Sequence, residues 1–309
     1  MVKTNFLKPQ GLKPDYIVGF IDGEGSFNIT ISKDLNRSSN YRLICEMHIT
    51  QSANSVQLLH LIKDFFDCGV VKIDNKSTNT MNYQLSSYKD IANKIIPFLD
   101  KHPLLTSKYL NYQTFKKVIN MMINQEHLTT EGMNKIIDLA NQMNSKRSFS
   151  EKFNFCLSHL AKHSITSDWI TGFVDGEGCF YFYIGKQTNT TIQLQASLEI
   201  AQNTHDILIL EEIKKFFGCG RLKPKISHIN LESVEKAIGI SRLIISNPTD
   251  LKTIIIPFFD INSLLTTKSL DFADWKLLIE MKNQKYHLSS EGLKKMIQIK
   301  SNMNTSRKF

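Results

Sequence analysis

Alternating apolar and polar positions predict a half-buried strand near the start of the chain, in residues 26–32. Neighbouring side chains of a strand point to opposite faces, so strict alternation indicates one packed face and one open face. The apolar face holds Phe27, Ile29 and Ile31, and the polar face holds Asn28, Thr30 and Ser32. Residues 41–51 alternate in the same way and predict a second strand.

The sequence pattern also predicts the other helices and strands of the first half. Residues 14–23 form a short apolar run with Pro14 and Asp15 suited to a first helical turn and glycines suited to a helix end, which predicts a short helix. Residues 55–66 have the apolar spacing of an amphipathic helix. Two strands near 69–75 and 80–86 and helices near 89–98 and 106–124 complete the order αββαββα, with one more C-terminal helix.

The pattern then recurs, which indicates an internal duplication. Three sequence pairs carry it: I-V-G-F-I-D-G-E-G (17–25) with I-T-G-F-V-D-G-E-G (170–178), I-I-P-F (95–98) with I-I-P-F (255–258), and L-L-T-S-K (104–108) with L-L-T-T-K (264–268). We expect a first repeat at 1–144, a polar linker at 145–165 and a second repeat at 166–309.

Composition narrows the class of protein. The 309 residues are 41% hydrophobic, as in a folded globular protein, and carry a net charge of +9, which favours a polyanionic partner such as nucleic acid. Five scattered cysteines without a C-x-x-C pair argue against a zinc site or a disulfide framework. We expect no membrane span and no secretory signal, because long apolar runs are missing from the sequence.

The polar faces of the strands carry long hydrogen-bonding side chains, which suit base edges in a DNA major groove. A solvated sheet face is the alternative. A ten-residue strand rises about 33 Å, which corresponds to roughly ten base pairs. The expected DNA-facing residues are Asn28, Thr30, Ser32, Arg37, Arg42, Glu46, His48, Lys72, Asn82, Gln84, Tyr181, Tyr183, Lys186, Gln193, Gln195, Ser197, Glu199, Arg221, Lys223, Lys225 and Arg242.

Each copy of the first helix ends in a D-G-E-G sequence. Gly19 and Gly23 lie on one helix face, as do their counterparts Gly172 and Gly176, and this spacing favours close packing of the two helices. Such packing would bring Glu24 and Glu177 together. Two adjacent carboxylates repel, and a divalent cation such as Mg²⁺ relieves the repulsion. A single D-G-E-G would favour a solvated helix end instead; the duplication and the basic charge favour the metal site.

The two D-G-E-G helices resemble the signature motifs of single-chain LAGLIDADG homing endonucleases, in particular the monomeric enzymes encoded in fungal mitochondrial introns. The resemblance extends over almost the whole chain. It implies that Glu24 and Glu177 bind divalent metal, with help from the backbone carbonyls of Gly23 and Gly176. It also implies that the earlier acids, Asp22 and Asp175, are structural.

Four further positions match the family. The resemblance implies that Gln51 and Gln202, at the ends of the second strands, order water near the scissile phosphates. It implies that Lys108 and Lys268 polarise solvent or stabilise charge at the phosphate. The alternatives are an ordinary surface glutamine and an ordinary lysine at a helix start.

The resemblance implies an α+β monomer made of two pseudo-symmetric αββαββα repeats, with the D-G-E-G helices at the interface and two four-stranded antiparallel sheets forming a saddle over DNA. It implies a site-specific endonuclease that cuts both strands of a target of about 20 base pairs and leaves short 3′ overhangs. Mg²⁺ is the expected cofactor, Mn²⁺ a substitute, and Ca²⁺ an ion that binds without cleavage. The location expected by analogy is the mitochondrion. An RNA maturase that binds its host intron, or a non-cleaving DNA-binding regulator, is the alternative.

Overall fold

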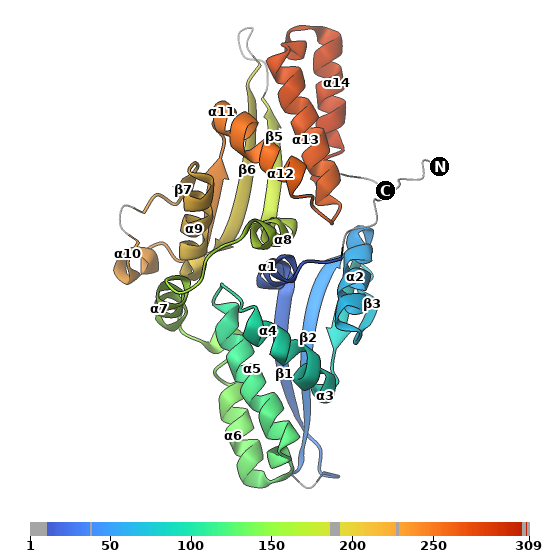
Figure 1. Cartoon of the computed structure of the whole chain (residues 1–309), viewed down its shortest axis with the longest axis vertical. Coiled ribbons are helices and arrows are strands. Elements are labelled where there is room, and N and C mark those ends of the chain that lie inside the picture. The colour runs from blue at the N-terminus through green and yellow to red at the C-terminus, as the bar shows by residue number, and fades with distance from the viewer. Residues whose placement is uncertain (1–10, 38, 186–191, 227–228, 305–306, 308–309) are drawn as a thin grey trace.

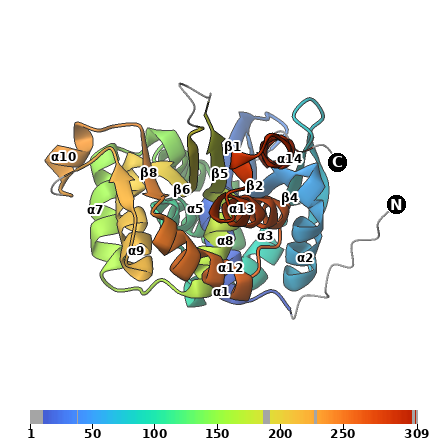
Figure 2. The same cartoon turned by 90° about the horizontal axis from the view of Figure 1, so that it is seen from above.

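Two similar halves of the chain meet at a pair of central helices (Figure 1). The structure is a computed structural model that describes residues 11–37, 39–185, 192–226, 229–304 and 307. The central helices are α1 (Pro14–Glu24) and α8 (Ser167–Glu177), which lie between α2 (Val56–Phe66) and α9 (Ile207–Phe217) in both views (Figures 1 and 2).

The first half contains a four-stranded antiparallel sheet with the strand order β1-β2-β4-β3. Its strands are β1 (Gly25–Lys33), β2 (Tyr41–Ser52), β3 (Val70–Asn75) and β4 (Thr80–Leu85). Its other helices are η1 (Ala53–Ser55), α3 (Tyr88–Asp90), η2 (Ile91–Ile95), α4 (Ile96–Lys101), α5 (Lys108–Ile123), η3 (Glu126–Leu128), α6 (Thr130–Ala140) and η4 (Asn144–Lys146).

The second half repeats this topology with the order β5-β6-β8-β7. Its strands are β5 (Gly178–Ile184), β6 (Leu194–Asn203), β7 (Arg221–Lys223) and β8 (Ile240–Ile245). Its other helices are η5 (Thr204–Asp206), α10 (Leu231–Glu235), α11 (Pro248–Asp250), η6 (Leu251–Ile255), α12 (Ile256–Ile261), α13 (Lys268–Asn283), η7 (Tyr286–Leu288) and α14 (Ser290–Ser301). The predicted element order and the α+β class are confirmed in both halves.

One predicted helix is longer than expected and irregular. The helix predicted at 89–98 spans α3, η2 and α4, and η2 is a widened π turn. Pro97 lies two residues after the end of η2. Proline has no N–H, and its ring crowds the carbonyl four residues earlier, so a wider turn relieves the clash. The second repeat places the π turn η6 before Pro257 in the same way.

The segment 145–165, predicted as a polar linker, contains a helix, α7 (Phe149–Leu160). The hydroxyl of Ser148 accepts a hydrogen bond from the N–H of Glu151 and caps its first turn. Phe153 and Cys156 are buried on its inner face. The polar composition therefore concealed a short amphipathic helix that packs on the second repeat near α9 and η5.

The backbones of α1 and α8 approach as closely as the glycine spacing predicted. A Cβ atom on Gly19 would lie 2.1 Å from the carbonyl oxygen of Trp169, and one on Gly172 would lie 2.0 Å from that of Tyr16. Real Cβ atoms do not occupy such positions, so only glycine permits this contact. A Cβ on Gly23 would lie 3.5 Å from the Cα of Gly176, an ordinary contact.

The core extends from this contact into both halves. Phe20 and Phe173 on the central helices, Phe27 on β1 and Phe180 on β5 are all fully buried.

All five cysteines are free, as their number and spacing predicted. Within the described ranges no helix combines the length and the apolar character needed to cross a membrane.

Gly19→Ala should lower the free energy of unfolding by about 2–3 kcal/mol, because the added methyl overpacks the helix contact. Urea unfolding of the purified chain measures this. Gly11→Ala is the matched control, since no atom of the described residues other than its chain neighbours lies within 4 Å of its added Cβ. Equal stability of the two variants would contradict the close backbone contact.

Candidate functional site

Two glutamates end the central helices and lie side by side. Glu24 is the last residue of α1 and Glu177 the last of α8, and the chain turns into a strand after each. A Cβ on Gly176 would lie 3.2 Å from the Cγ of Glu24, and one on Gly23 would lie 3.4 Å from the Cγ of Glu177. Each glutamate therefore packs over the glycine of the opposite helix, as the sequence predicted.

The surroundings of this pair disfavour two negative charges. Burial, helped by the charge of Glu177, raises the pKa of Glu24 from its ordinary value of 4.5 to about 7. Burial also raises the pKa of Glu177, while the nearby charges of Lys108 and Lys268 lower it. A bound cation would stabilise the ionised pair far more than water does here.

Two half-buried lysines lie against the last turns of the central helices. The Nζ atom of Lys108 donates to the carbonyl oxygens of Ile21 and Gly23, both at 2.9 Å. The carbonyl of Ile21 also accepts the backbone N–H of Gly25, and a cation complements the negative end of the helix dipole. Lys268 makes the equivalent bonds in the second half, at 2.9 Å, to the carbonyls of Val174 and Gly176. Burial lowers the pKa of both lysines, although the surrounding carboxylates oppose this.

The buried acid of each D-G-E-G sequence holds the loop that leads to the lysine. Asp22 accepts hydrogen bonds from the N–H of Leu105 at 2.8 Å and from the hydroxyl of Thr106 at 2.6 Å. It also accepts one from the indole N–H of Trp169 at 3.0 Å, across the helix interface. Asp175 makes the equivalent contacts in the second half, with Leu265, Thr266 and the hydroxyl of Tyr16. These contacts confirm the structural role expected for both acids.

Tyr16 and Trp169 were not singled out from the sequence. Each lies three residues before the first glycine of its helix, at Gly19 or Gly172, and each donates a hydrogen bond to the buried aspartate of the other repeat. An aromatic residue with a polar donor, repeated at one motif position, was the available signal. Together these bonds make each half depend on the other.

The two glutamines at the ends of the second strands lie against the glutamate pair. The Nε2 atom of Gln51 donates to Oε1 of Glu24 at 3.3 Å, and its own oxygen accepts from the N–H of Ser52. Gln202 hydrogen-bonds Glu177 and lowers its pKa. The structure thus brings all six side chains predicted as catalytic to one place; their catalytic roles stay predictions.

This set of groups fits a divalent cation. The described residues contain no cluster of three or more His, Cys, Asp or Glu side chains that could form a complete cage. Mg²⁺ commonly takes only one or two carboxylates and fills its shell with water and phosphate oxygens. Glu24 and Glu177 supply the carboxylates, and the carbonyls of Gly23 and Gly176 each keep a second lone pair beside the lysine bond.

Residues 17–119 and 170–279 match the family model described as LAGLIDADG endonuclease. The chain belongs to the LAGLIDADG endonuclease family. Its two matched segments contain most of each central helix and both sheets, so the family assignment rests on both repeats. Divalent-metal dependence is general in this family.

Individual LAGLIDADG relatives agree with this assignment. A probable intron-encoded endonuclease 2 of Neurospora crassa is 30% identical over 312 residues, covering 95% of this chain and 65% of that relative. The chain thus spans less than two thirds of the length of that curated relative. The I-SmaMI LAGLIDADG homing endonuclease bound to cleaved DNA has 28% identity and a TM-score of 0.82, with 96% of this chain and 98% of that chain covered.

Two further solved LAGLIDADG structures are informative. The I-LtrWI enzyme bound to target DNA has 30% identity and a TM-score of 0.82, and the match covers 96% of this chain and 98% of that chain. A second structure of I-SmaMI holds an uncleaved DNA target in the presence of calcium ions. It has 28% identity and a TM-score of 0.82, and the match covers 95% of this chain and 99% of that chain.

The LAGLIDADG sheets expose most of the residues predicted to face DNA. Tyr181 and Tyr183 on β5 are 41% and 40% exposed, although aromatic side chains are usually buried. The other exposed members are Thr30, Ser32, Arg37, Arg42, Lys72, Gln193, Gln195, Arg221, Lys223, Lys225 and Arg242. The partly exposed members are Asn28, Glu46, His48, Gln84 and Glu199.

Two predicted DNA contacts are wrong as direct contacts, because the side chains are buried. Asn82 is 3% exposed, and its Nδ2 atom lies 2.6 Å from Nδ1 of His48. Ser197 is 1% exposed and donates to Glu199 at 3.1 Å. Both lie on inner strands, where longer neighbours cover them. Lys186 lies outside the described residues.

The raised pKa of Glu24 has a consequence for stability. Between about pH 4.5 and 7 the unfolded chain loses this proton while the folded chain keeps it, so folding stability falls as pH rises. Without divalent cations, Glu24→Gln should therefore be more stable than wild type at pH 8, on the order of 2 kcal/mol after allowance for solvent access. The gap should close near pH 4.5. Urea unfolding in a chelator measures both points.

Magnesium provides the control for this prediction. At pH 8, added Mg²⁺ should raise the stability of wild type more than that of Glu24→Gln, because only wild type keeps both carboxylates. A wild type that is the more stable protein at pH 8 in chelator would contradict the account.

Proposed function

We propose that this chain is a site-specific DNA endonuclease that cuts both strands of its target. The observation that carries the proposal is that Glu24 and Glu177 lie side by side at the interface of the two repeats, each directly before the first strand of its own sheet. Each half presents one acid, one half-buried lysine and one glutamine, so the site contains two equivalent sets of groups. A duplex has two strands, and one set serves each strand.

The reaction is phosphodiester hydrolysis. Mg²⁺, when bound by Glu24 and Glu177 with the carbonyls of Gly23 and Gly176, would supply charge stabilisation at the scissile phosphate. The Nζ atoms of Lys108 and Lys268 place positive charge beside the same carbonyls, where they stabilise negative charge on the phosphate oxygens.

Gln51 and Gln202 orient the glutamates and hold water next to them. Burial at the ends of α1 and α8 limits competition from bulk water, which strengthens these charge interactions.

The sheets bind the DNA. Strand β2 has 12 residues and β6 has 10, so each sheet spans about 33–40 Å. That length corresponds to roughly ten base pairs for each half, or about twenty in total. Exposed basic residues such as Arg221, Lys223 and Arg242 pair with phosphates and base edges. Cuts by two adjacent sites across the minor groove leave short 3′ overhangs.

Several relatives are described as intron-encoded endonucleases, so we propose that cleavage serves the homing of a mitochondrial intron. Mn²⁺ replaces Mg²⁺ in this proposal, and Ca²⁺ binds without supporting cleavage, in agreement with the uncleaved target in the calcium structure of I-SmaMI. The relatives and structures named above give no support to an RNA partner or to a non-cleaving regulator.

Wild-type protein with Mg²⁺ should cut members of a randomised DNA library, and Glu24→Gln and Glu177→Gln should lower the cleavage rate by about a thousandfold or more. Sequencing of the cut ends measures the rate, the target and the overhang. The two variants keep the size and shape of the side chain, so their binding to the recovered target provides the folding control.

A library left uncut by wild type, together with tight binding of an intron RNA, would exclude the endonuclease function. Cleavage that survives in both glutamine variants would instead exclude the proposed metal ligands.

Lys223→Ala should weaken binding to any DNA sequence, because the exposed ammonium pairs with a phosphate. The slope of log affinity against log salt should become shallower by about 0.9. Lys215→Ala is the matched control: Lys215 is exposed on α9, which covers the opposite face of the same sheet. An identical salt dependence for the two variants would rule out a phosphate contact at Lys223.

A further inference from the structure

The loop that carries each lysine is held from the other repeat. Lys108 is the first residue of α5, and Ser107 before it is the N-cap residue. A serine at this position usually bonds its own helix, but Ser107 makes no such bond. Its N–H and hydroxyl instead donate to the carboxylate of Asp206, at 2.7 and 2.9 Å. Asp206 belongs to the second repeat.

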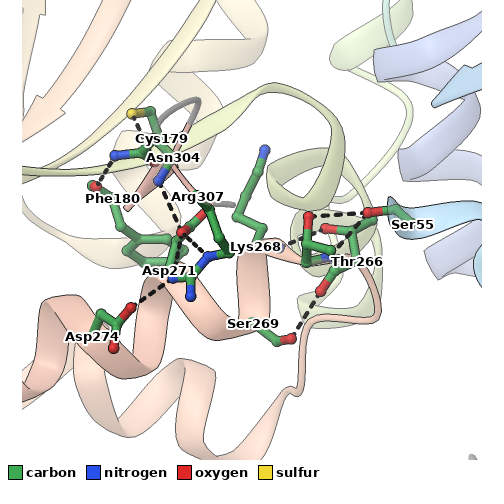
Figure 3. Close-up of polar contacts among 11 residues, drawn as sticks. Ser55, Cys179, Phe180, Thr266, Lys268, Ser269, Asp271, Asp274, Asn304 and Arg307 are labelled. Atoms are coloured by element: carbon green, nitrogen blue, oxygen red, sulfur yellow. Dashed lines mark hydrogen bonds and ion pairs between the residues drawn. The ribbon is translucent and has the colours of Figure 1, made fainter. Parts of the chain in front are cut away.

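The same arrangement occurs in reverse at the other lysine. Lys268 begins α13, and its N-cap residue Thr267 also makes no bond to its own helix. The N–H of Thr267 donates to the hydroxyl of Ser55 at 3.0 Å, and the two hydroxyls lie 3.1 Å apart. Figure 3 shows Ser55 reaching from the first repeat towards the loop that carries Thr266 and Lys268.

Both crossing residues follow the glutamine of their own repeat. Ser55 ends η1, the short turn after the strand that contains Gln51. Asp206 ends η5, the turn after the strand that contains Gln202. Each turn therefore joins the glutamine of one half to the lysine loop of the other half.

We propose that Asp206 and Ser55 are positioning residues that act across the repeat interface, Asp206 on Lys108 and Ser55 on Lys268. The proposal rests on the endonuclease function proposed above. Both residues are buried, so neither is exposed to a substrate. Each fixes the start of the helix from which the lysine reaches its two carbonyl oxygens, and a small shift of a catalytic group costs much of its effect.

The two contacts are unequal in strength. Asp206 is buried, and it also accepts from the thiol of Cys156 at 3.0 Å and lies 3.3 Å from Nε2 of His205. Burial alone would raise the pKa of Asp206, but the hydrogen bond and charge of His205, together with the hydrogen bonds from Cys156 and Ser107, lower the pKa below its ordinary value. Ser55 offers only a neutral hydroxyl, and hydrogen bonds to a charged group are stronger. Loss of Asp206 should therefore have the larger effect.

Strand-resolved cleavage tests the proposal. The probe is a plasmid with the target recovered from the library, cut by excess protein with Mg²⁺, and each strand is followed separately. Lys108→Ala and Lys268→Ala first show which strand depends on which lysine. Asp206→Ala should slow the Lys108-dependent strand by about tenfold or more and change the other strand much less. Ser55→Ala should slow the Lys268-dependent strand.

Asp206→Asn keeps one acceptor oxygen, so it should restore part of the rate and serves as the second variant if Asp206→Ala does not fold. Cys156→Ala is the matched control, since it removes a buried neighbour of Asp206 and leaves the bonds to Ser107. Equal slowing of both strands by Asp206→Ala would show a general structural role and overturn the proposal.

Amide hydrogen exchange separates this proposal from the proposed function, because it needs no cleavage. In the full chain without DNA, Asp206→Ala should speed exchange in residues 104–108 and leave residues 264–268 unchanged. Ser55→Ala should do the reverse. Unchanged exchange at both loops would overturn the crossed positioning even if the protein is a nuclease. Wild type that cuts no DNA would overturn the function.

Discussion

The contact between the backbones of α1 and α8 is the constraint on which the rest of the structure depends. Gly19 and Gly172 allow each helix to touch a carbonyl of the other, at a spacing that excludes any side chain. Only at this distance do Glu24 and Glu177 become neighbours. Burial and mutual repulsion disfavour two ionised glutamates, and a bound cation would relieve this. The two lysines lie nearby because their Nζ atoms donate to carbonyl oxygens in the last turns of the same helices.

Hydrogen bonds across the interface extend this dependence beyond the helices. The buried aspartates accept bonds from Trp169 and Tyr16 of the opposite helix, while Asp206 and Ser55 hold the opposite lysine loops. Neither half contains all the contacts that place its own lysine. The two sites are therefore built together, which suits the proposed reaction, in which two strands are cut in one binding event.

Much of the fold could be predicted from the sequence, because strand alternation and helical spacing report burial directly. The glycine contact was also predictable, since two glycines on one face are costly unless another backbone approaches. The family resemblance located Lys108 and Gln51, whose roles no local pattern reveals. Helix α7 was missed because its apolar face is short, and the burial of Asn82 and Ser197 was missed because it depends on neighbouring strands.

The sequence gives little indication of the contacts that Asp206 and Ser55 make with the lysine loop of the other repeat. Both follow the glutamine of their repeat by the same number of residues, but one is an acid and the other a hydroxyl, so the repeat comparison hides their shared position. Their function becomes visible only when the second repeat is placed beside the first. Contacts between segments far apart in sequence are the part of a site that sequence patterns describe least.

The most direct test of the central claim is anomalous diffraction from Mn²⁺ in a crystal of this protein bound to its DNA target. The account predicts metal density within bonding distance of the carboxylates of Glu24 and Glu177 and of phosphate oxygens from the DNA. Metal density confined to sites away from both glutamates would contradict it.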